Sequence, residues 1–373
     1  MRIRIKDAHI HHLRVPIENP IKTSFGVMDS RHAVFLILED EHGLQGIGES
    51  WVNFPRWAPW ERVSAFEKGY IPYLKGREVE DIASFIVDMA KAFRGPAQQS
   101  GTMGAYLQAV CAVEMALWDL AAKMAGVPLN RLLFDNPATS VRIYGSGVNS
   151  PIQWKAIDEH LEKGVGLFKL KLGFGRETDI KNLEDMTSHL GDSARIAVDA
   201  NRKWGMDEAR EWLDILKEFD VQWLEEPLRV EDESMTRELY DRRLVKIAGG
   251  ENFLIDPVGC DAQLLADSPL DIFQPDITKY CPIHNALDLL EAVNQRGRKL
   301  FPHFLGSAPG QAASLHLASG CGDVLMEWDV NPNPLRTALF TKPFEIENGL
   351  IEIPNTPGIG WKLDFEKIEE FLA

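Results

Sequence analysis

Hydrophobic and polar positions alternate along the first part of the chain and then change to helical spacing. Three runs alternate as β-strands would, at residues 2–15, 32–40 and 44–50. Residues 40–43 (DEHG) are typical of a turn, so these runs predict an antiparallel meander. Residues 104–126 then carry apolar positions at helical spacing. Gly126, with Pro128 just beyond, predicts the end of that helix.

From about Val141 short apolar runs alternate with amphipathic stretches. Eight of these runs are expected to be strands, namely VRIYGSGV, FKLKLG, RIAVDAN, VQWLEEP, VKIAGGE, DIFQPD, KLFPH and VLMEW. Several of the intervening helical segments open with favourable caps, such as Ser150-Pro151 and Asp256-Pro257. Eight such units predict a closed parallel (β/α) barrel. An open doubly wound sheet is the alternative, but no glycine-rich phosphate turn follows the first strand.

We therefore expect an α/β protein with two packed units. Residues 1–128 would form an α+β capping domain, residues 129–340 the barrel, and residues 341–373 a tail that packs back on the capping domain. The hydrophobic fraction of 45% is ordinary for a full globular core.

The charge and the remaining composition exclude several partners. A net charge of -16 argues against nucleic-acid binding, which needs a basic face. No run approaches the ~18 apolar residues of a membrane span, and the N-terminus lacks the apolar segment of a signal peptide. The cysteines are scattered, which fits a reducing compartment. These features predict a cytoplasmic protein without nucleic-acid or membrane partners.

Ionisable residues stand at the ends of seven consecutive predicted barrel strands. They are Lys169 and Lys171 on the second strand and then, one per strand, Asp199, Glu225, Glu251, Asp276, His303 and Glu327. The spacings from Asp199 onward are 26, 26, 25, 27 and 24, which is the strand–helix repeat itself. Functional groups in such barrels lie at the C-terminal ends of the strands, facing one mouth. Any single acid here could cap a helix or pair with a lysine, but the whole series predicts one shared site.

Three neighbouring carboxylates in this series predict a metal site. Asp199, Glu225 and Glu251 would repel one another strongly unless a cation lay between them. Ligation by oxygen alone favours a hard cation, and Mg²⁺ usually keeps open positions for water and substrate.

The lysines and the histidine predict proton transfer. Lys169 and Lys171 are two residues apart on a strand and so share a face. They could simply fill the barrel beside acids, or one could abstract a proton while the other holds a substrate carboxylate. In the second case a like charge and a metal would lower the lysine pKa. Asp276 on the adjacent strand could fix the tautomer of His303. Glu327 could be a fourth ligand, but its distance around the ring favours a hydrogen bond to the substrate carboxylate.

The motifs KLK, VDAN, WLEEP, GGEN, QPD and FPH resemble the mandelate racemase branch of the enolase superfamily. The segment ALWDLAAKMAGVPLNRLL is similar to the superfamily's capping-domain helix and domain junction, so the resemblance covers nearly the whole chain. It implies a modified TIM barrel of the enolase type. It also implies these roles: Mg²⁺ ligands Asp199, Glu225 and Glu251, a base Lys171 on one face, an Asp276–His303 dyad on the other, and enolate stabilisation by Lys169 and Glu327.

The chain departs from the family pattern at two places. LLFDN replaces the usual glycines after the domain junction, and YCPI follows Lys279 where a Gly-Gly pair is common. The muconate-lactonizing branch carries a catalytic lysine on the sixth strand, so a lysine pair that includes Lys279 remains an alternative. Asp276 together with His303 favours the Asp–His version.

The resemblance implies removal of an α-proton from a small carboxylic acid. The segment MEWDVNPNPLRTALF is similar to sugar-acid members, which favours dehydration of a sugar acid to a 2-keto-3-deoxy acid. Cycloisomerisation of a sugar-acid lactone and racemisation or epimerisation of a 2-hydroxy acid remain open. From other classes, a Schiff-base lyase using Lys169 or Lys171 and a non-catalytic metal-binding barrel are also considered.

Specificity is expected to come from the capping unit. A loop at residues 17–30 and the segment WVNFPRW would close over the barrel mouth as a rather apolar lid. The expected substrate contacts are Asn201, Thr23, Trp51 and Arg56, with Ser24 and His11 as further candidates. We also expect a homo-oligomer, between a dimer and an octamer.

Overall fold

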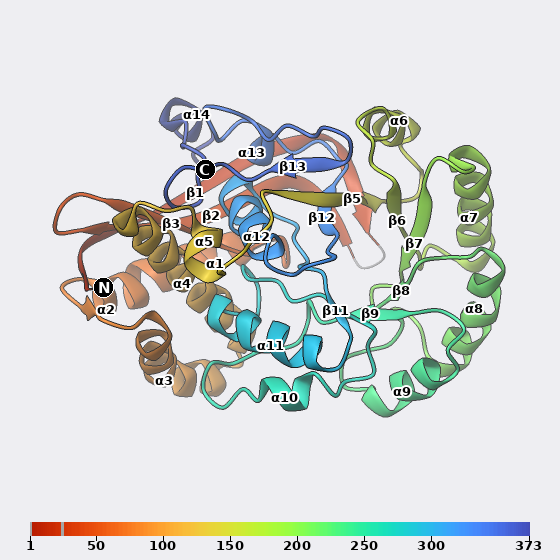
Figure 1. Ribbon diagram of the computed structural model, residues 1–373, viewed down its shortest axis with the longest axis horizontal. Helices are drawn as coiled ribbons and strands as arrows, with labels where there is room; N and C mark the ends of the chain where they lie inside the picture. Colours follow the sequence, from red (N-terminus) through yellow and green to blue (C-terminus); the bar gives the residue numbers. More distant parts are fainter. Residues whose placement is uncertain (1, 24–25) are drawn as a thin grey trace.

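The computed structural model describes residues 2–23 and 26–373, with only the backbone of residues 19, 22 and 23. The chain opens with an antiparallel sheet in the order β3-β2-β1-β4 (Figure 1). Its strands are β1 (Ile3–Thr23), β2 (Gly26–Asp40), β3 (Gln45–Ser50) and β4 (Glu78–Val79). The predicted meander is confirmed, with a short fourth strand added at its edge.

The expected loop at residues 17–30 is wrong, because most of it continues the β1–β2 hairpin. After a register shift that begins at Pro16, pairing resumes with Ile21 opposite Met28. Proline has no backbone N–H, so the ladder is interrupted there without ending the hairpin. The hairpin carries cap residues from the sheet toward the barrel (Figure 1).

Helices cover one side of the capping sheet. They are α1 (Ala58–Ala65), the π-helix η1 (Phe66–Tyr70), α2 (Ile71–Leu74), α3 (Ile82–Ser100), α4 (Met103–Ala125) and α5 (Leu129–Leu133). Helix α4 ends at Gly126, which takes the left-handed conformation with φ 70°, as predicted. In the part of the chain that the structure describes, α4 alone is long and apolar enough to cross a membrane. Because 89% of that apolar stretch is buried, it is a core helix of this fold.

All eight predicted barrel strands form. They are β5 (Ser140–Val148), β6 (Leu167–Lys171), β7 (Arg195–Asp199), β8 (Leu224–Glu225), β9 (Ile247–Gly249), β10 (Ile272–Phe273), β11 (Lys299–Leu300) and β12 (Met326–Asp329). They pair in parallel in the order β11-β10-β9-β8-β7-β6-β5-β12. The sheet curls into a barrel of the enolase type.

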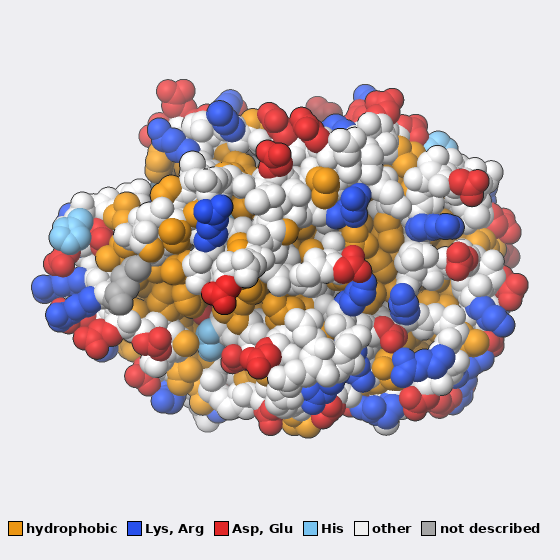
Figure 2. Space-filling view, in the orientation of Figure 1, with side chains coloured by type: hydrophobic (Ala, Val, Ile, Leu, Met, Phe, Trp, Pro, Cys, Tyr) orange, Lys and Arg blue, Asp and Glu red, His pale blue; other side chains and the backbone are white. Residues whose placement is uncertain are grey.

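One helix lies in each crossover and covers the outside of the curled sheet (Figure 1). These helices are α6 (Trp154–Glu162), α7 (Arg176–Leu190), α8 (Met206–Glu218), α9 (Glu233–Asp241), α10 (Ala262–Leu265), α11 (Ile283–Gln295) and α12 (Ala308–Ala318). Acidic and basic side chains are interspersed over the visible face rather than gathered by sign (Figure 2).

The C-terminal segment contacts both units. It contains α13 (Pro334–Thr337), β13 (Leu350–Glu352) and α14 (Phe365–Glu370). Strand β13 pairs antiparallel with β5 of the barrel. At the end of the chain the amide of Ala373 donates to the carbonyl of His12 at 2.9 Å, so the tail also extends the capping sheet.

A carboxylate of the cap is bound at the start of a barrel helix. Glu49 near the end of β3 is buried and accepts hydrogen bonds from the amide and hydroxyl of Ser307, both at 2.7 Å, and from the amide of Gly310 at 2.8 Å. Ser307 directly precedes α12, so Glu49 takes up N–H groups that a helix start leaves unpaired. Burial raises the pKa of Glu49 to about 7, although these hydrogen bonds oppose the shift.

The first prediction concerns the packing of β3 on α4. A Cβ atom on Gly48 would overlap the carbonyl oxygen of Ala112, which belongs to the helix backbone and cannot move aside cheaply. We expect Gly48→Ala to lower the free energy of unfolding by about 1–3 kcal/mol or more in urea titrations. Gly166→Ala is the matched control, because a Cβ there would meet nothing within 4 Å. Equal stability of the two variants would contradict this packing.

The second prediction concerns Glu49. Its pKa of about 7 lies above its ordinary value of 4.5, so the folded chain holds this proton more tightly than the unfolded chain. The free energy of unfolding should therefore fall as pH rises through this interval, by up to about 3 kcal/mol from this one group. Glu49→Gln cannot ionise and should flatten that part of the slope. Urea unfolding at several pH values, compared with the parent chain, checks this, and an unchanged slope would contradict it.

Candidate active site

The strand ends gather the predicted residues into one layer of the barrel. In the ladders Lys171 pairs with Asp199, and Asp199 with Glu225. Glu251 follows β9 after Gly250, whose φ of 124° is open mainly to glycine. Parallel strands in register place their C-terminal ends at one edge of the sheet, so these side chains share the mouth.

Lys169 is the centre of a buried network of charges. Its side chain is 0% exposed, and its Nζ lies 2.5 Å from Glu225, 2.8 Å from Glu327 and 3.8 Å from Asp199. Lys171 pairs with Asp199. Burying a charge is strongly unfavourable without such partners, so each lysine compensates the acids of its neighbouring strands.

The predicted dyad is in place geometrically. Asp276 Oδ2 lies 2.8 Å from Nδ1 of His303. The other oxygen of Asp276 accepts hydrogen bonds from the amide of Thr278 at 2.7 Å and from its hydroxyl at 2.6 Å. An ionised carboxylate only accepts, so Nδ1 of the histidine carries the proton. The other ring nitrogen, Nε2, pairs with Glu251 and lies 3.6 Å from Glu327.

The expected depression of the lysine pKa is not found with protein groups alone. Burial is the largest single effect on the pKa of Lys171 and lowers it, but the charges of Asp199, Glu225 and Glu327 together outweigh it, and the pKa is raised. In the same way burial lowers the pKa of His303 while Glu251 and Glu327 raise it, and the outcome is well above its ordinary value. The expectation assumed a metal that takes up the negative charge of these acids.

The donor chemistry of the acids fits a hard cation. Burial, with repulsion from Asp199 and Glu327, raises the pKa of Glu225 to about 8 although Lys169 opposes it. Within residues 2–23 and 26–373 no three His, Cys, Asp or Glu side chains converge in an arrangement ready to hold a metal ion. Each of the three predicted ligands instead contacts an amine or the imidazole. The set contains oxygen donors only, which suits Mg²⁺.

A cavity of about 70 Å³ lies between cap and barrel at this mouth. The cap side is mainly apolar and the barrel side mainly polar. The lining residues are Ile21, Met28, Arg31, Phe54, Ser146, Gly147, Asn149, Lys171, Asn201, His303, Leu305, Glu327, Asp329 and Asn331. We refer to this space as the mouth cavity. Lys171 and His303, the predicted base and acid, both border it.

The expected substrate contacts differ in their position relative to the mouth cavity. Asn201 lines the mouth cavity. Trp51 does not line it, and its ring instead lies 4.8 Å from the ammonium of Lys279. Arg56 points away, with a side chain 75% exposed and an ion pair to Asp29 at 2.7 Å. The side chain of Thr23 and the whole of Ser24 lie outside the described residues.

Two other residues considered from the sequence also lie elsewhere. His11 stacks on Phe35 of the capping sheet, with ring centroids 5.2 Å apart. Lys279 donates to Asn252 at 2.8 Å and lies 3.5 Å from Glu251. It does not border the mouth cavity, whereas His303 does. This placement favours the Asp–His pair over a lysine pair.

Sequence reasoning missed the polar residues above the strand ends. Arg31 of β2 and Asp329 of β12 form a buried ion pair of 2.6 Å, and Asn149 and Asn331 lie beside them in the cavity lining. A signal existed for Asp329, because it lies two residues after Glu327 and so shares its face of the strand. For Arg31 the signal was a charge on the same face of the strand as the buried Ala33 and Phe35.

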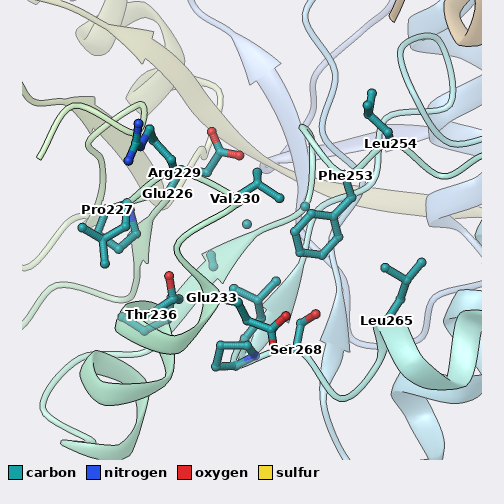
Figure 3. Close-up of a pocket in the computed structure, with 17 residues that line it drawn as sticks. Glu226, Pro227, Arg229, Val230, Glu233, Thr236, Phe253, Leu254, Leu265 and Ser268 are labelled. Atoms are coloured by element: carbon teal, nitrogen blue, oxygen red, sulfur yellow. The ribbon is translucent and has the colours of Figure 1, made fainter. Parts of the chain in front are cut away.

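A second, larger cavity of about 220 Å³ lies outside the barrel (Figure 3). It opens between α9 and α10, against the outer side of β9, and shares no lining residue with the mouth cavity. Its charged lining residues are Glu226, Arg229 and Glu233, and the other lining residues are uncharged. Val230, Phe253 and Leu265 face the cavity. The arrangement of acids and bases described above is at the smaller cavity.

Known proteins carry the same two units. The family described as mandelate racemase / muconate lactonizing enzyme, N-terminal domain matches residues 5–133, and the one described as enolase C-terminal domain-like matches residues 155–368. A mandelate racemase/muconate lactonizing enzyme from Bordetella bronchiseptica RB50 has the same fold, with a TM-score of 0.89 and 29% identity over 99% of both chains.

Two curated relatives indicate the reactions found among similar chains. A D-galactarolactone cycloisomerase from Agrobacterium fabrum is 25% identical over 99% of both chains. An L-talarate/galactarate dehydratase from Salmonella typhimurium is 28% identical over 87% of this chain and 79% of its own. With both family matches together spanning most of the sequence, the chain belongs to the mandelate racemase/muconate lactonizing enzyme family of the enolase superfamily.

Proposed function

We propose that this enzyme removes the α-proton of a sugar acid and eliminates water to give a 2-keto-3-deoxy acid. The observation that carries the proposal is that Lys171 and His303 border one cavity, from strands on different sides of the barrel. A base and an acid that reach one substrate separately allow proton removal and departure of the leaving group in a single site.

The roles follow from the contacts of each group. Nζ of Lys171 takes the α-proton, which leaves negative charge on the substrate carboxylate. Lys169 would stabilise that charge through its ammonium. Glu327, which lies 2.8 Å from Lys169, would do so in its protonated form, since only a protonated carboxyl can donate a hydrogen bond to the substrate. Nε2 of His303 gives its proton to the β-hydroxyl, which departs as water. Asp276 holds the ring so that this nitrogen faces the cavity.

Asp199, Glu225 and Glu251 are the residues that would hold Mg²⁺. Bound there, Mg²⁺ supplies positive charge where the substrate carboxylate becomes more negative. With Asp199 engaged as a ligand, Lys171 would lose its ion-pair partner and would give up its proton more readily, as a base requires.

The two walls of the mouth cavity suit a hydroxylated acid. The barrel side offers amide groups from Asn149, Asn201 and Asn331, which can exchange hydrogen bonds with hydroxyls. The cap side offers Ile21, Met28 and Phe54 to the C–H edges of the same chain. The dehydratase relative supports elimination of water, and the cycloisomerase relative, which aligns over 99% of this chain, makes lactone isomerisation the second candidate.

Substitution of the two proton-transfer groups tests the mechanism. Lys171→Ala and His303→Asn should each reduce kcat by a factor of about 10³ or more, because general acid–base catalysis is lost. Mg²⁺ binding, measured by calorimetry, should survive in both. Loss of the ion in either variant would contradict the assigned role.

Removal of the metal tests the ligand set. EDTA should abolish turnover, and added Mg²⁺ should restore it. The same should hold for α-proton exchange with D₂O, which reports enolisation without elimination. Activity that resists EDTA and a protein–substrate adduct trapped by borohydride would instead indicate a Schiff-base enzyme.

A panel of sugar acids and their lactones identifies the reaction. With Mg²⁺ present, a 2-keto-3-deoxy product from an acid supports dehydration. Consumption of a lactone without such a product from any acid supports the cycloisomerase, and a change of configuration alone supports the racemase. Failure of every compound to exchange its α-proton would overturn the enolisation proposal.

A further inference from the structure

A buried ion pair joins the cap to the barrel at the mouth cavity. Arg31 of β2 and Asp329 of β12 are each about 3% exposed, lie 2.6 Å apart, and both line the cavity. The mechanism proposed above assigns them no role. Among the described cap residues that line the cavity, Arg31 alone is charged.

In this pair both carboxylate oxygens accept hydrogen bonds, whereas one N–H group of the guanidinium has no partner in the described part of the chain. Asp329 Oδ1 accepts from the amide and side-chain nitrogens of Asn331 at 3.0 and 2.8 Å, and its Oδ2 accepts from Arg31. Arg31 has five N–H donors, of which Nη2 serves Asp329. Its Nε is buried and has no partner among the described residues. A buried donor without an acceptor is unfavourable, so a ligand oxygen at this place would complete the site.

The local charge favours an anion. Behind Asp329 lies a second buried guanidinium, Arg336, whose Cζ is 4.2 Å from the ring centre of Trp328. Burial lowers the pKa of Arg336 to about 10. The negative charge of Asp329 opposes that shift and the positive charge of Arg31 adds to it, so the three charged groups interact. Two guanidiniums with one carboxylate leave this group with a net positive charge.

The strand sets the distance of this group from the reacting centre. Asp329 lies two residues beyond Glu327 on the same face of β12. Two residues of strand advance by ~7 Å toward the cap. A substrate whose reacting carboxylate lies near Glu327 and Lys169 would thus place its far end at Arg31.

We propose that Arg31 binds a second carboxylate at the far end of the substrate, so that the substrate class is a sugar diacid rather than a sugar monoacid. This inference rests on the proposed function for the position of the reacting carboxylate. The planar guanidinium matches a carboxylate in a two-point geometry that lysine cannot reproduce. Asp329, to which Asn331 donates two hydrogen bonds, holds the guanidinium in position for it.

The test compares diacids with monoacids that differ only in the terminal group, for example galactarate with galactonate, over a panel of stereoisomers with Mg²⁺. The parent enzyme should prefer its diacid. Arg31→Gln should reduce the ratio of kcat/KM for the diacid to kcat/KM for the matched monoacid about 100-fold, chiefly through KM for the diacid. This ratio separates the lost carboxylate contact from a loosening of the cap, which would affect both acids alike. Arg31→Lys should recover little of that loss, because the charge returns without the planar fork. Arg56→Gln, an exposed arginine of the same cap, is the matched control and should change neither value.

A second experiment measures ligand binding and does not depend on turnover. Adipate and hexanoate have equal length and differ in one carboxylate. In calorimetry with Mg²⁺, adipate should bind the parent enzyme at least about tenfold more tightly than hexanoate, and Arg31→Gln should remove the difference. Equal binding of the two acids, or a preference for monoacids that Arg31→Gln leaves unchanged, would overturn the proposal. If no acid exchanges its α-proton while adipate still depends on Arg31, the proposed reaction fails and the diacid site stands.

Discussion

Compensation of buried charge is the constraint on which the barrel mouth depends. Lys169 is fully buried, and this is possible because Glu225 and Glu327 lie within 2.8 Å of its ammonium. The same acids could not be buried together without the lysine. The lysine stabilises the charged form of each acid, whereas the acids destabilise the charged forms of one another. The network therefore behaves as one unit rather than as separate groups. Strand register places all of these groups in one layer, so a change of register would disrupt the whole set.

The second constraint is the attachment of the cap. Glu49 is bound at the start of α12, and Arg31 pairs with Asp329 on the following strand. Both links are buried and both are made of short hydrogen bonds to carboxyl oxygens, so they are strongly directional. They hold the apolar wall of Ile21 and Phe54 over the strand ends, which gives the mouth cavity its upper side.

Much of this architecture could be predicted from the sequence because its signals are local or periodic. The eight strands and helix α4 follow from spacing and cap residues, and the approach of Asp276 to His303 follows from strand order. The β1–β2 hairpin beyond Pro16 could not, since a loop and an interrupted strand look alike in one chain. The pairing of Arg31 with Asp329 joins positions 298 apart, and no local pattern reports such a contact. The raised pKa of Lys171 depends on its distance to Asp199, which only the fold sets.

The mouth cavity is lined mainly by two parts of the chain, the ends of the barrel strands and a hairpin of the cap. The groups that we propose to move protons lie at the ends of barrel strands, whereas Ile21, Met28 and Arg31 come from a hairpin of the cap. Substitutions of Ile21 or Met28 can therefore alter which acid is accepted without breaking the buried ion pair, whereas a substitution of Arg31 would leave the buried carboxylate of Asp329 without its guanidinium. In the proposed enzyme, specificity and chemistry thus belong to separate elements of the fold: the apolar wall can change one residue at a time, whereas the charged strand ends would have to change together.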